Sequence, residues 1–231
     1  MGFDLWIFGA THSELKLIIR ELGAIPWREM DGCFEAEVEK DRIGIATVGV
    51  GMPRACFRIG KLLGLFPSPR AIMIGSCGAF PGSALAPGDL LVAEGEILSE
   101  LGVVQAEGIG NSGPLAHLGL EQELAMSGRL ADELLLAASA VSRAKKGRLL
   151  TVLGSSPSGE VARKRASTFN ALAENMEGYC LALAGKSLGI EVGELRGVSN
   201  EAGDRNLGKW DLERAQLLAQ KAILEYLRRS H

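Results

Sequence analysis

The segment ENMEG at residues 174–178, followed by SNEAGDR at residues 199–205, is the most informative about how this chain folds. Both polar segments stand at the ends of apolar runs, and the second run, 192–198, has the length and composition of a buried strand. In an α/β protein, the polar groups that follow strands collect at one edge of the sheet, where ligands bind. The pattern therefore predicts an α/β fold with a ligand site at the strand ends.

The side chains in these two segments suit the two ends of a nucleoside. Glu177 can accept hydrogen bonds from a pair of vicinal hydroxyls, while Asn200 and Asp204 can meet a heteroaromatic base. Simpler explanations exist for each of them. An acidic residue in the first turn of a helix complements the helix dipole, and Ser, Asn, Gly and Asp are common turn residues. The order of the residues, an amide directly after the strand and then an acid, favours a role in binding.

Composition limits the class of protein. A chain of 231 residues with 47% hydrophobic and 23% charged residues is typical of one globular domain, here residues 1–231. A net charge of −3 without any basic run argues against a nucleic-acid partner. Four cysteines without a CxxC spacing and three histidines give no zinc pattern, which predicts no metal and a reduced, cytoplasmic compartment. Neither a leader peptide nor an apolar run of ~18 residues is present, so we expect no membrane partner.

Short β-rich runs alternate with helical patterns along the chain. The predicted strands are 5–9, 33–38, 43–48, 71–74, 89–93, 103–106, 149–153 and 192–198. The predicted helices are 13–22, 53–63, 130–141, 176–188 and 211–228. A hairpin at 33–48 must add an antiparallel pair to an otherwise parallel arrangement. We therefore predict a three-layer α/β fold, with a mixed central sheet flanked by helices.

Several short motifs suggest other chemistry and are set aside. AGKS at 184–187 lacks the earlier glycine of a phosphate-binding loop. GVG at 49–51 lacks the third glycine of a dinucleotide fingerprint, so it predicts a tight strand-to-helix turn where backbone approaches a ligand. Cys77 has no histidine with supporting context, which favours a small residue in a glycine-rich turn at 75–78 over a nucleophile.

Glu14 has two interpretations. THSE at 11–14 fits a capping box, with Thr11 at the N-cap and Glu14 three residues later. Alternatively, Glu14 is a carboxylate at the carboxyl end of the first strand, placed to orient or deprotonate a water molecule.

Together the motifs resemble the nucleosidase/purine nucleoside phosphorylase superfamily, and within it the futalosine hydrolases of menaquinone biosynthesis. The matching segments cover nearly the whole chain in the family's order: GAT at 9–11 with Glu14, VGVG at 48–51, GSCGAF at 75–80, GDLLV at 88–92, ENMEG at 174–178, and SN at 199–200 through Trp210. Single glycine motifs carry little weight, but ENMEG followed by SNEAGDR and a tryptophan is specific.

The resemblance implies a phosphorylase/hydrolase-like fold and hydrolysis of the N-glycosidic bond of futalosine, which releases hypoxanthine and dehypoxanthine futalosine. It implies no cofactor, a nucleoside as the small-molecule partner, and a homo-oligomer, with a dimer favoured. The implied catalytic residues are Glu14, Asn200 and Asp204. The implied substrate-binding residues are Gly51, Ser76, Cys77, Gly78, Asn175, Met176, Glu177 and Ser199.

The sequence departs from the family pattern at several positions. Related nucleosidases that act on 6-aminopurines commonly have an aspartate where Asn200 stands, and the amide suits a 6-oxopurine because it both donates and accepts. GSSP at 154–157 replaces a segment that often supplies an aromatic residue to stack on the base, which leaves Phe80 and Phe169 as candidates. Asn206 stands where many relatives have an acid.

Three further functions stay open. A purine nucleoside phosphorylase could cradle phosphate with Arg54 and Ser76. A 5′-methylthioadenosine/S-adenosylhomocysteine nucleosidase is disfavoured by Asn200. A non-catalytic nucleoside-binding protein would keep the fold and the pocket but release no base.

Overall fold

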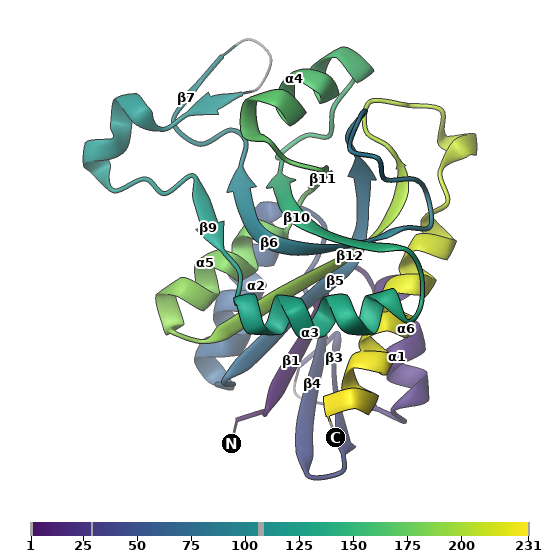
Figure 1. Cartoon of the computed structure of the whole chain (residues 1–231). Helices are drawn as coiled ribbons and strands as arrows, with labels where there is room; N and C mark the ends of the chain where they lie inside the picture. The colour runs from purple at the N-terminus through teal and green to yellow at the C-terminus, as the bar shows by residue number, and fades with distance from the viewer. Residues whose placement is uncertain (1, 29, 106–108, 231) are drawn as a thin grey trace.

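The computed structural model describes residues 2–28, 30–105 and 109–230, in which a large mixed sheet lies between two groups of helices (Figure 1). The strands are β1 Leu5–Gly9, β2 Ile25–Pro26, β3 Cys33–Val38, β4 Asp41–Thr47, β5 Arg70–Ala79, β6 Leu90–Leu98, β7 Val103–Val104, β8 Gly110–Asn111, β9 Glu123–Ala125, β10 Ala144–Thr151, β11 Ala173–Asn175 and β12 Glu191–Glu201. The α-helices are α1 Lys16–Glu21, α2 Met52–Leu65, α3 Gly128–Ser139, α4 Gly159–Phe169, α5 Gly178–Leu188 and α6 Leu212–Ser230. Short 3₁₀ helices are η1 His12–Glu14, η2 Gly113–Leu118 and η3 Leu207–Lys209.

The main sheet has the strand order β11-β10-β6-β12-β5-β1-β4-β3-β2, with β9 paired to β6. Its centre is parallel, because β12, β5, β1 and β4 all run in the same direction. The β3–β4 hairpin and the β12–β6 pair are antiparallel, so the sheet is mixed as the sequence predicts. β11 also pairs with β5, which closes β5, β12, β6, β10 and β11 into a ring at one end of the molecule.

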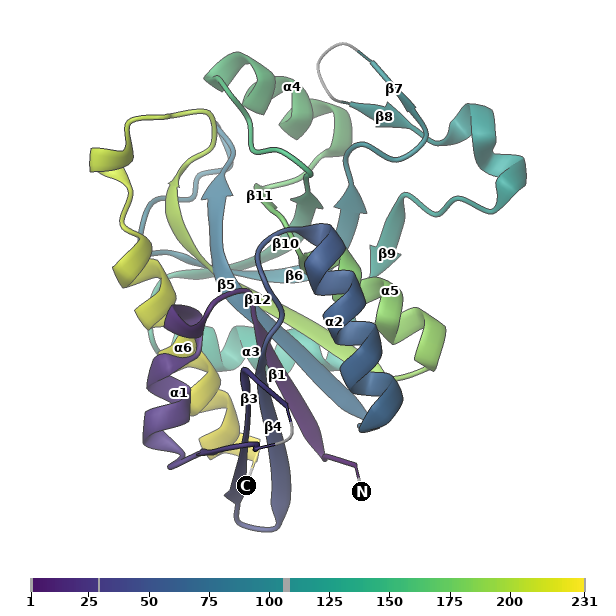
Figure 2. The same cartoon turned by 180° about the vertical axis from the view of Figure 1, so that it is seen from behind.

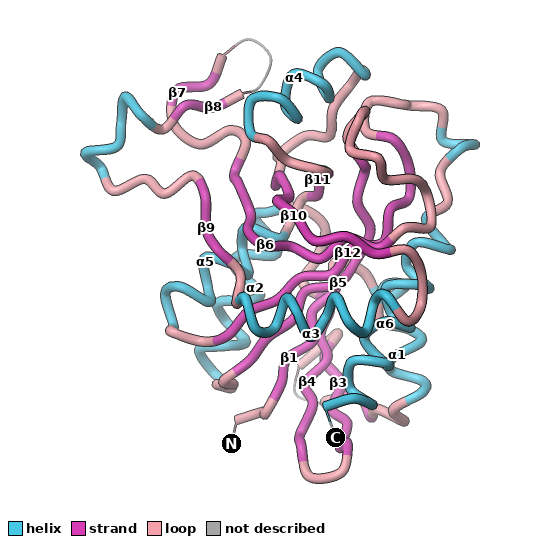
Figure 3. The backbone as a smooth tube through the Cα atoms, viewed as in Figure 1, coloured by secondary structure: helices cyan, strands magenta, loops and turns pink. Residues whose placement is uncertain are grey.

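Helices cover both faces of the sheet, which gives the three layers (Figures 2 and 3). Each face carries its own hydrophobic core. On one face, α2 and α5 pack through residues such as Ile59 and Leu181. On the other, α1, α3 and α6 pack through residues such as Ile18, Leu134 and Ile223. The carboxyl ends of the parallel strands are left uncovered by these helices, and the polar segments of the sequence gather there.

Local sequence explains how two of the helices begin. Gly51 has a φ of +88°, which favours glycine, and Pro53 falls in the first turn of α2, where its missing N–H costs nothing. Glu177 takes the N-cap position of α5, directly after β11. These two helix starts face each other, since the Gly51 N–H donates to the Glu177 carboxylate.

Most predicted elements are confirmed, with boundary shifts of a few residues. The strand 5–9 and the hairpin 33–48 are present, and helices form at the predicted places. The predicted helix 13–22 divides into η1 and α1, because the Thr11–Glu14 turn is already occupied by its own capping contact. The last residue of the predicted strand 103–106 lies outside the described residues. No prediction covers the strands β2, β8, β9 and β11, which are two or three residues long, or the helix α4, whose sequence GEVARKRASTF has few apolar residues.

Two predicted turns are instead parts of strands. Residues 75–78 belong to β5, because β12 pairs alongside them as far as Ala79. Ser199 and Asn200 likewise lie inside β12, which continues to Glu201 through an irregularity after Val198. A bulge of this kind turns side chains toward a new direction, here toward the edge where the other polar residues lie.

The packing of α6 on β12 gives a stability prediction. A side chain at Gly197 would overlap the backbone of Ala215 in α6, which cannot move without shifting the helix. Gly197→Ala should therefore lower the free energy of unfolding by about 1–3 kcal/mol. Gly64→Ala is the matched control, because nothing lies within 4 Å of its added methyl group and alanine favours the helix by roughly 0.5–1 kcal/mol. Denaturant unfolding of both variants checks this, and equal stabilities would contradict the packing argument.

Candidate active site

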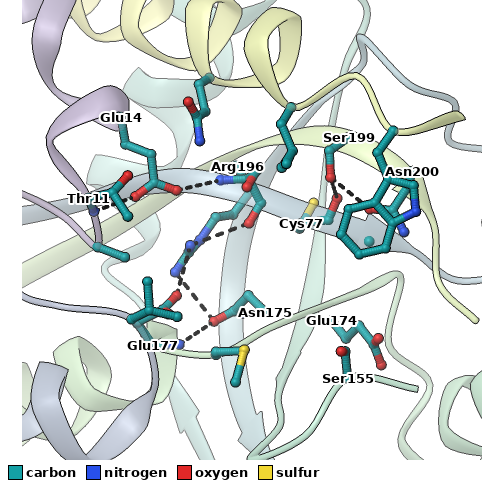
Figure 4. Close-up of a pocket in the computed structure, with 18 of the residues that line it drawn as sticks. Thr11, Glu14, Cys77, Ser155, Glu174, Asn175, Glu177, Arg196, Ser199 and Asn200 are labelled. Atoms are coloured by element: carbon teal, nitrogen blue, oxygen red, sulfur yellow. Dashed lines mark hydrogen bonds and ion pairs between the residues drawn. The ribbon is translucent and has the colours of Figure 1, made fainter. Parts of the chain in front are cut away.

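A pocket of about 340 Å³ opens at the carboxyl ends of β1, β5 and β12 (Figure 4). This volume falls within the range for small-molecule sites. The lining residues come from many separate parts of the chain: Ala10, Thr11, Glu14, Val50, Ser76, Cys77, Gly78, Val152, Ser155, Glu174, Asn175, Met176, Glu177, Arg196, Ser199, Asn200, Arg205, Trp210, Leu212 and Gln216. All the catalytic and substrate-binding residues that the resemblance implies line this pocket except Gly51 and Asp204.

Glu177 is held by two contacts at the N-terminus of α5. Its Oε1 accepts from the Gly51 backbone N–H at 2.9 Å, and its Oε2 lies 3.3 Å from Nη1 of Arg196. The carboxylate is buried, so both contacts act with little competition from water. Although Gly51 does not line the pocket, its N–H fixes one oxygen of a residue that does. The predicted approach of backbone at this turn is therefore found, directed at Glu177.

Arg196 is a fully buried cation in the middle of β12. Its Nε donates to Glu194 at 2.7 Å, and Nη2 lies 3.3 Å from the Asn175 side-chain oxygen. Burial alone would lower the pKa of the guanidinium, but the charges of Glu194, Glu177 and Glu14 outweigh it and raise that pKa. Arg196 therefore stays charged, and Figure 4 shows it between the carboxylates of Glu14 and Glu177.

Glu14 serves the turn and the pocket at once. Its Oε2 accepts from the Thr11 N–H at 3.0 Å, which is the backbone contact expected of a capping box. Its Oε1 lies 3.3 Å from the Ser76 N–H, on β5. A side chain at Gly75 would come within 2.8 Å of this oxygen and 2.6 Å of Arg196 Nη1, so glycine is needed there. Burial raises the pKa of Glu14, with Arg196 acting in the opposite direction.

Asn200 and its neighbours form the opposite side of the pocket. The Asn200 Oδ1 lies 2.7 Å from the Ser199 hydroxyl, and its Nδ2 donates to the Glu201 carbonyl at 2.9 Å. One N–H and one lone pair of the amide remain for a ligand. Cys77 is buried beside them, and burial raises the pKa of its thiol to about 12. A neutral thiol is a poor nucleophile, in agreement with the interpretation of Cys77 as a small pocket residue.

Asp204 points away from the pocket lining. Its carboxylate accepts from the Asn206 N–H at 2.9 Å and from the Lys209 ammonium at 3.0 Å, and these contacts lower its pKa. Its carbonyl accepts from the Trp210 indole N–H at 3.0 Å. In this arrangement Asp204 shapes the loop that carries Arg205 and Trp210, both of which do line the pocket.

Sequence reasoning gave no role to Arg196 or Trp210, although both line the pocket. A signal for Arg196 was present, because two charged residues in ELR at 194–196 interrupt an otherwise apolar run. Trp210 is the aromatic side chain among the described lining residues, with Arg205 stacked 5.1 Å from its ring centre. Phe80 and Phe169, the candidates for base stacking, belong to a separate hydrophobic cluster and do not line the pocket.

Within residues 2–28, 30–105 and 109–230, no group of three or more His, Cys, Asp or Glu side chains could hold a metal ion. Within the same part of the chain, no helix is both long and apolar enough to span a bilayer.

Comparison with known proteins gives the family. The model of the phosphorylase superfamily matches residues 4–228, so the chain belongs to this superfamily. It is 28% identical to a futalosine hydrolase of Thermus thermophilus over 88% of this chain and 85% of that protein. It is 34% identical to a futalosine hydrolase of Acidothermus cellulolyticus, over 54% of this chain and 51% of that protein.

Solved structures share the fold. A futalosine hydrolase of Helicobacter pylori superposes with a TM-score of 0.83 at 20% identity, over 97% of each chain. A methylthioadenosine nucleosidase variant from the same organism, with 5′-methylthioadenosine in its active site, gives a TM-score of 0.84 at 21% identity, covering 99% of this chain and 100% of that one. At 20% and 21% identity, these likenesses show the fold of the molecule alone.

Proposed function

We propose that this protein hydrolyses the N-glycosidic bond of futalosine, a step of menaquinone biosynthesis, and releases hypoxanthine. The bond between the ribose C1′ and the base breaks, water adds its hydroxyl to C1′, and its proton ends on the departing base. Such a reaction needs a grip on the sugar, a positioned water molecule and a group that stabilises the base. The observation that carries the proposal is the placement of two buried carboxylates, Glu14 and Glu177, at one side of the pocket, with Asn200 on the other.

Glu177 is the residue proposed to bind the ribose hydroxyls. Gly51 and Arg196 each contact one of its oxygens, which fixes the plane of the carboxylate before substrate enters. A carboxylate has further lone pairs beyond these two contacts and can accept from a diol. Met176, next to it, lines the pocket and offers an apolar surface to the sugar.

Glu14 is the residue proposed to orient and deprotonate the water. Backbone N–H groups of Thr11 and Ser76 hold its two oxygens. Burial moves its pKa upward, toward the range in which a carboxylate is an effective base near neutral pH. Arg196 lies on the same side of the pocket and balances part of the negative charge there.

Asn200 is the residue proposed to bind the 6-oxopurine. Its free N–H can donate to O6 or N7, while its oxygen can accept from a ring N–H. Negative charge builds on the base as the glycosidic bond breaks, so a donor in this place stabilises the transition state. Asp204, the second acid proposed from the sequence, would support the base indirectly through the loop that carries Trp210.

Phosphorolysis is less well supported by the pocket. Arg54, the proposed phosphate ligand, does not line it and is exposed. The buried cation, Arg196, already contacts Glu194 and Glu177. A phosphate placed near Glu14 and Glu177 would be repelled by the two negative charges, whereas a neutral water would not be repelled. This charge arrangement favours hydrolysis.

An adenine-specific nucleosidase and a non-catalytic binding protein would each place different demands on the pocket. A methylthioadenosine nucleosidase protonates an adenine base, a task better suited to an aspartate than to Asn200. A binding protein has no need of a buried Glu14 with a raised pKa.

We also propose a cytoplasmic homodimer. This state is supported by the family resemblance and by exposed apolar side chains on α2 and α5, namely Phe57 and Leu183. Large apolar side chains that a single chain leaves in water are commonly covered by a partner.

Base release from three nucleosides tests the proposed function. Futalosine, inosine and 5′-methylthioadenosine are each incubated with the protein, with and without phosphate, and free base is measured by chromatography. We expect hypoxanthine from futalosine at a rate that phosphate does not change. A strict requirement for phosphate would identify a phosphorylase, preferential adenine release would identify the 6-aminopurine class, and no release would leave a binding protein.

Glu14→Gln separates catalysis from capping. The amide can still accept from Thr11 but cannot take a proton, so kcat/KM should fall by ~10²-fold or more and the acid limb of the pH profile should disappear.

The pKa of Glu14 is raised above its ordinary value of 4.5. Glu14 therefore contributes to stability below pH 4.5, and this contribution is lost as the pH rises through the raised pKa. At neutral pH the removal of the buried charge favours the variant, while the loss of the acceptor for the Ser76 N–H opposes this, so the melting temperature should change little. Ser13→Ala, an exposed neighbour, is the control; an unchanged rate in Glu14→Gln would leave Glu14 as a cap.

A further inference from the structure

A pair of carboxyl groups is buried behind the pocket. Glu96 on β6 and Glu194 on β12 are both fully buried, and neither lines the pocket. They meet beneath the first turn of α5, since a side chain at Gly178 would overlap oxygens of both. Two carboxyl groups this close cannot both ionise cheaply in the protein interior.

Glu96 is connected to the start of α5 through two polar side chains. Its Oε2 accepts from the Thr151 hydroxyl at 2.7 Å, and its Oε1 accepts from the Asn175 amide at 2.5 Å. The Asn175 oxygen in turn accepts from the N–H groups of Glu177 at 2.9 Å and Gly178 at 2.8 Å. The Thr151 hydroxyl accepts from the Tyr179 N–H at 2.9 Å. The N–H donors that a helix start leaves unpaired are thereby satisfied by groups that Glu96 orients.

Glu194 has one oxygen in use and one without a partner. Its Oε1 accepts from Arg196, while Oε2 is buried and has no hydrogen-bond partner in the described part of the chain. An ionised oxygen without a hydrogen-bond partner destabilises the protein interior, because nothing there replaces the water that would otherwise solvate it. A proton on Glu96 would give this oxygen a donor.

The charges around the pair agree with such a proton. Glu194 and Arg196 lie close to Glu96 on β12, and Cys77 on β5 and Cys180 on α5 also interact with its charge. Glu177, at the start of α5, contacts Arg196. Both thiols are neutral because their pKa values are raised, by burial for Cys77 and first by the neighbouring Cys56 for Cys180. Besides Glu96, three carboxylates surround the guanidinium of Arg196, namely those of Glu14, Glu177 and Glu194. Burial, and then the charge of Glu194, raise the pKa of Glu96 well above its ordinary value.

We propose that Glu96 is a protonated positioning residue, which donates to Glu194 and, through Asn175 and Thr151, fixes the helix start that carries Glu177. The proton keeps Glu194 available to Arg196, and Arg196 holds the second oxygen of Glu177. Glu96 acts on the ribose-binding carboxylate without contacting the ligand. The catalytic part of this inference rests on the proposed function, whereas the protonation state does not.

Glu96→Gln and Glu96→Ala give the first test. Glutamine keeps an acceptor for Asn175 and an N–H for Glu194, while the Thr151 hydroxyl can turn to the Asn175 oxygen at 3.4 Å. Glu96→Gln should therefore keep most of the wild-type kcat/KM on the nucleoside substrate. Glu96→Ala removes both connections and should lower kcat/KM by about 10–100-fold, as expected for a supporting residue. Equal losses in the two variants would overturn the proposal, because they would show that the negative charge of Glu96 is what matters.

Infrared spectroscopy gives a second test that needs no substrate. The wild-type protein at neutral pH should show the carbonyl stretch of a buried carboxylic acid, and Glu96→Gln should lose it. Glu14→Gln is the matched control, because its own raised pKa could produce a similar band, and the Glu96 band should persist in that variant. The absence of any band that depends on Glu96 would overturn the proposal. If no nucleoside is hydrolysed while the Glu96 band is present, the proposed function fails and the proton assignment stands.

Discussion

The ion pair between Arg196 and Glu177 is the interaction on which the site depends. It joins the middle of β12 to the first turn of α5, and both partners are buried. A buried ion pair contributes little net stability, but removing one partner typically costs about 3–5 kcal/mol because the other charge is stranded. Arg196 limits this cost with a second carboxylate, Glu194, at 2.7 Å. The pair is therefore better understood as fixing geometry than as stabilising the fold.

Glycines, which have no side chain, leave the space in which these charged groups meet. Gly75 leaves space for Glu14 and Arg196 to approach each other over β5. Gly178 leaves space for Glu96 and Glu194 under α5, and Gly51 adopts a positive φ that turns its N–H toward Glu177. At Gly75 and Gly178, the Cβ atom of any other residue would overlap the atoms that make these polar contacts. Gly75 and Gly178 thus serve the site, and Gly51 serves both the site and its turn.

The sequence predicted much of the fold, because strand and helix periodicities are local. The mixed sheet, the hairpin 33–48 and most helices follow from patterns a few residues long. Glu14, Glu177 and Asn200 could be brought to one pocket by prediction, because each follows an apolar run and the carboxyl ends of parallel strands meet. Their roles stay predictions. Arg196 was missed because its partners lie on other strands and helices, and nothing next to it in the sequence predicts them. The contacts of Asp204 with Asn206 and Lys209 could not be predicted either, since a loop's conformation decides where its acid points.

The carboxylate of Glu177, held by Arg196 and Gly51, is proposed to bind the ribose diol. The most direct measurement compares Glu177→Ala with the wild type on futalosine and on its 2′-deoxy analogue. We expect a loss of at least ~1 kcal/mol of transition-state binding on the riboside and a much smaller loss on the deoxyriboside. Glu174→Gln is the control, because this pocket carboxylate binds Ser156 and Arg165 and should affect both substrates alike. Equal losses of Glu177→Ala on the two substrates would contradict the account.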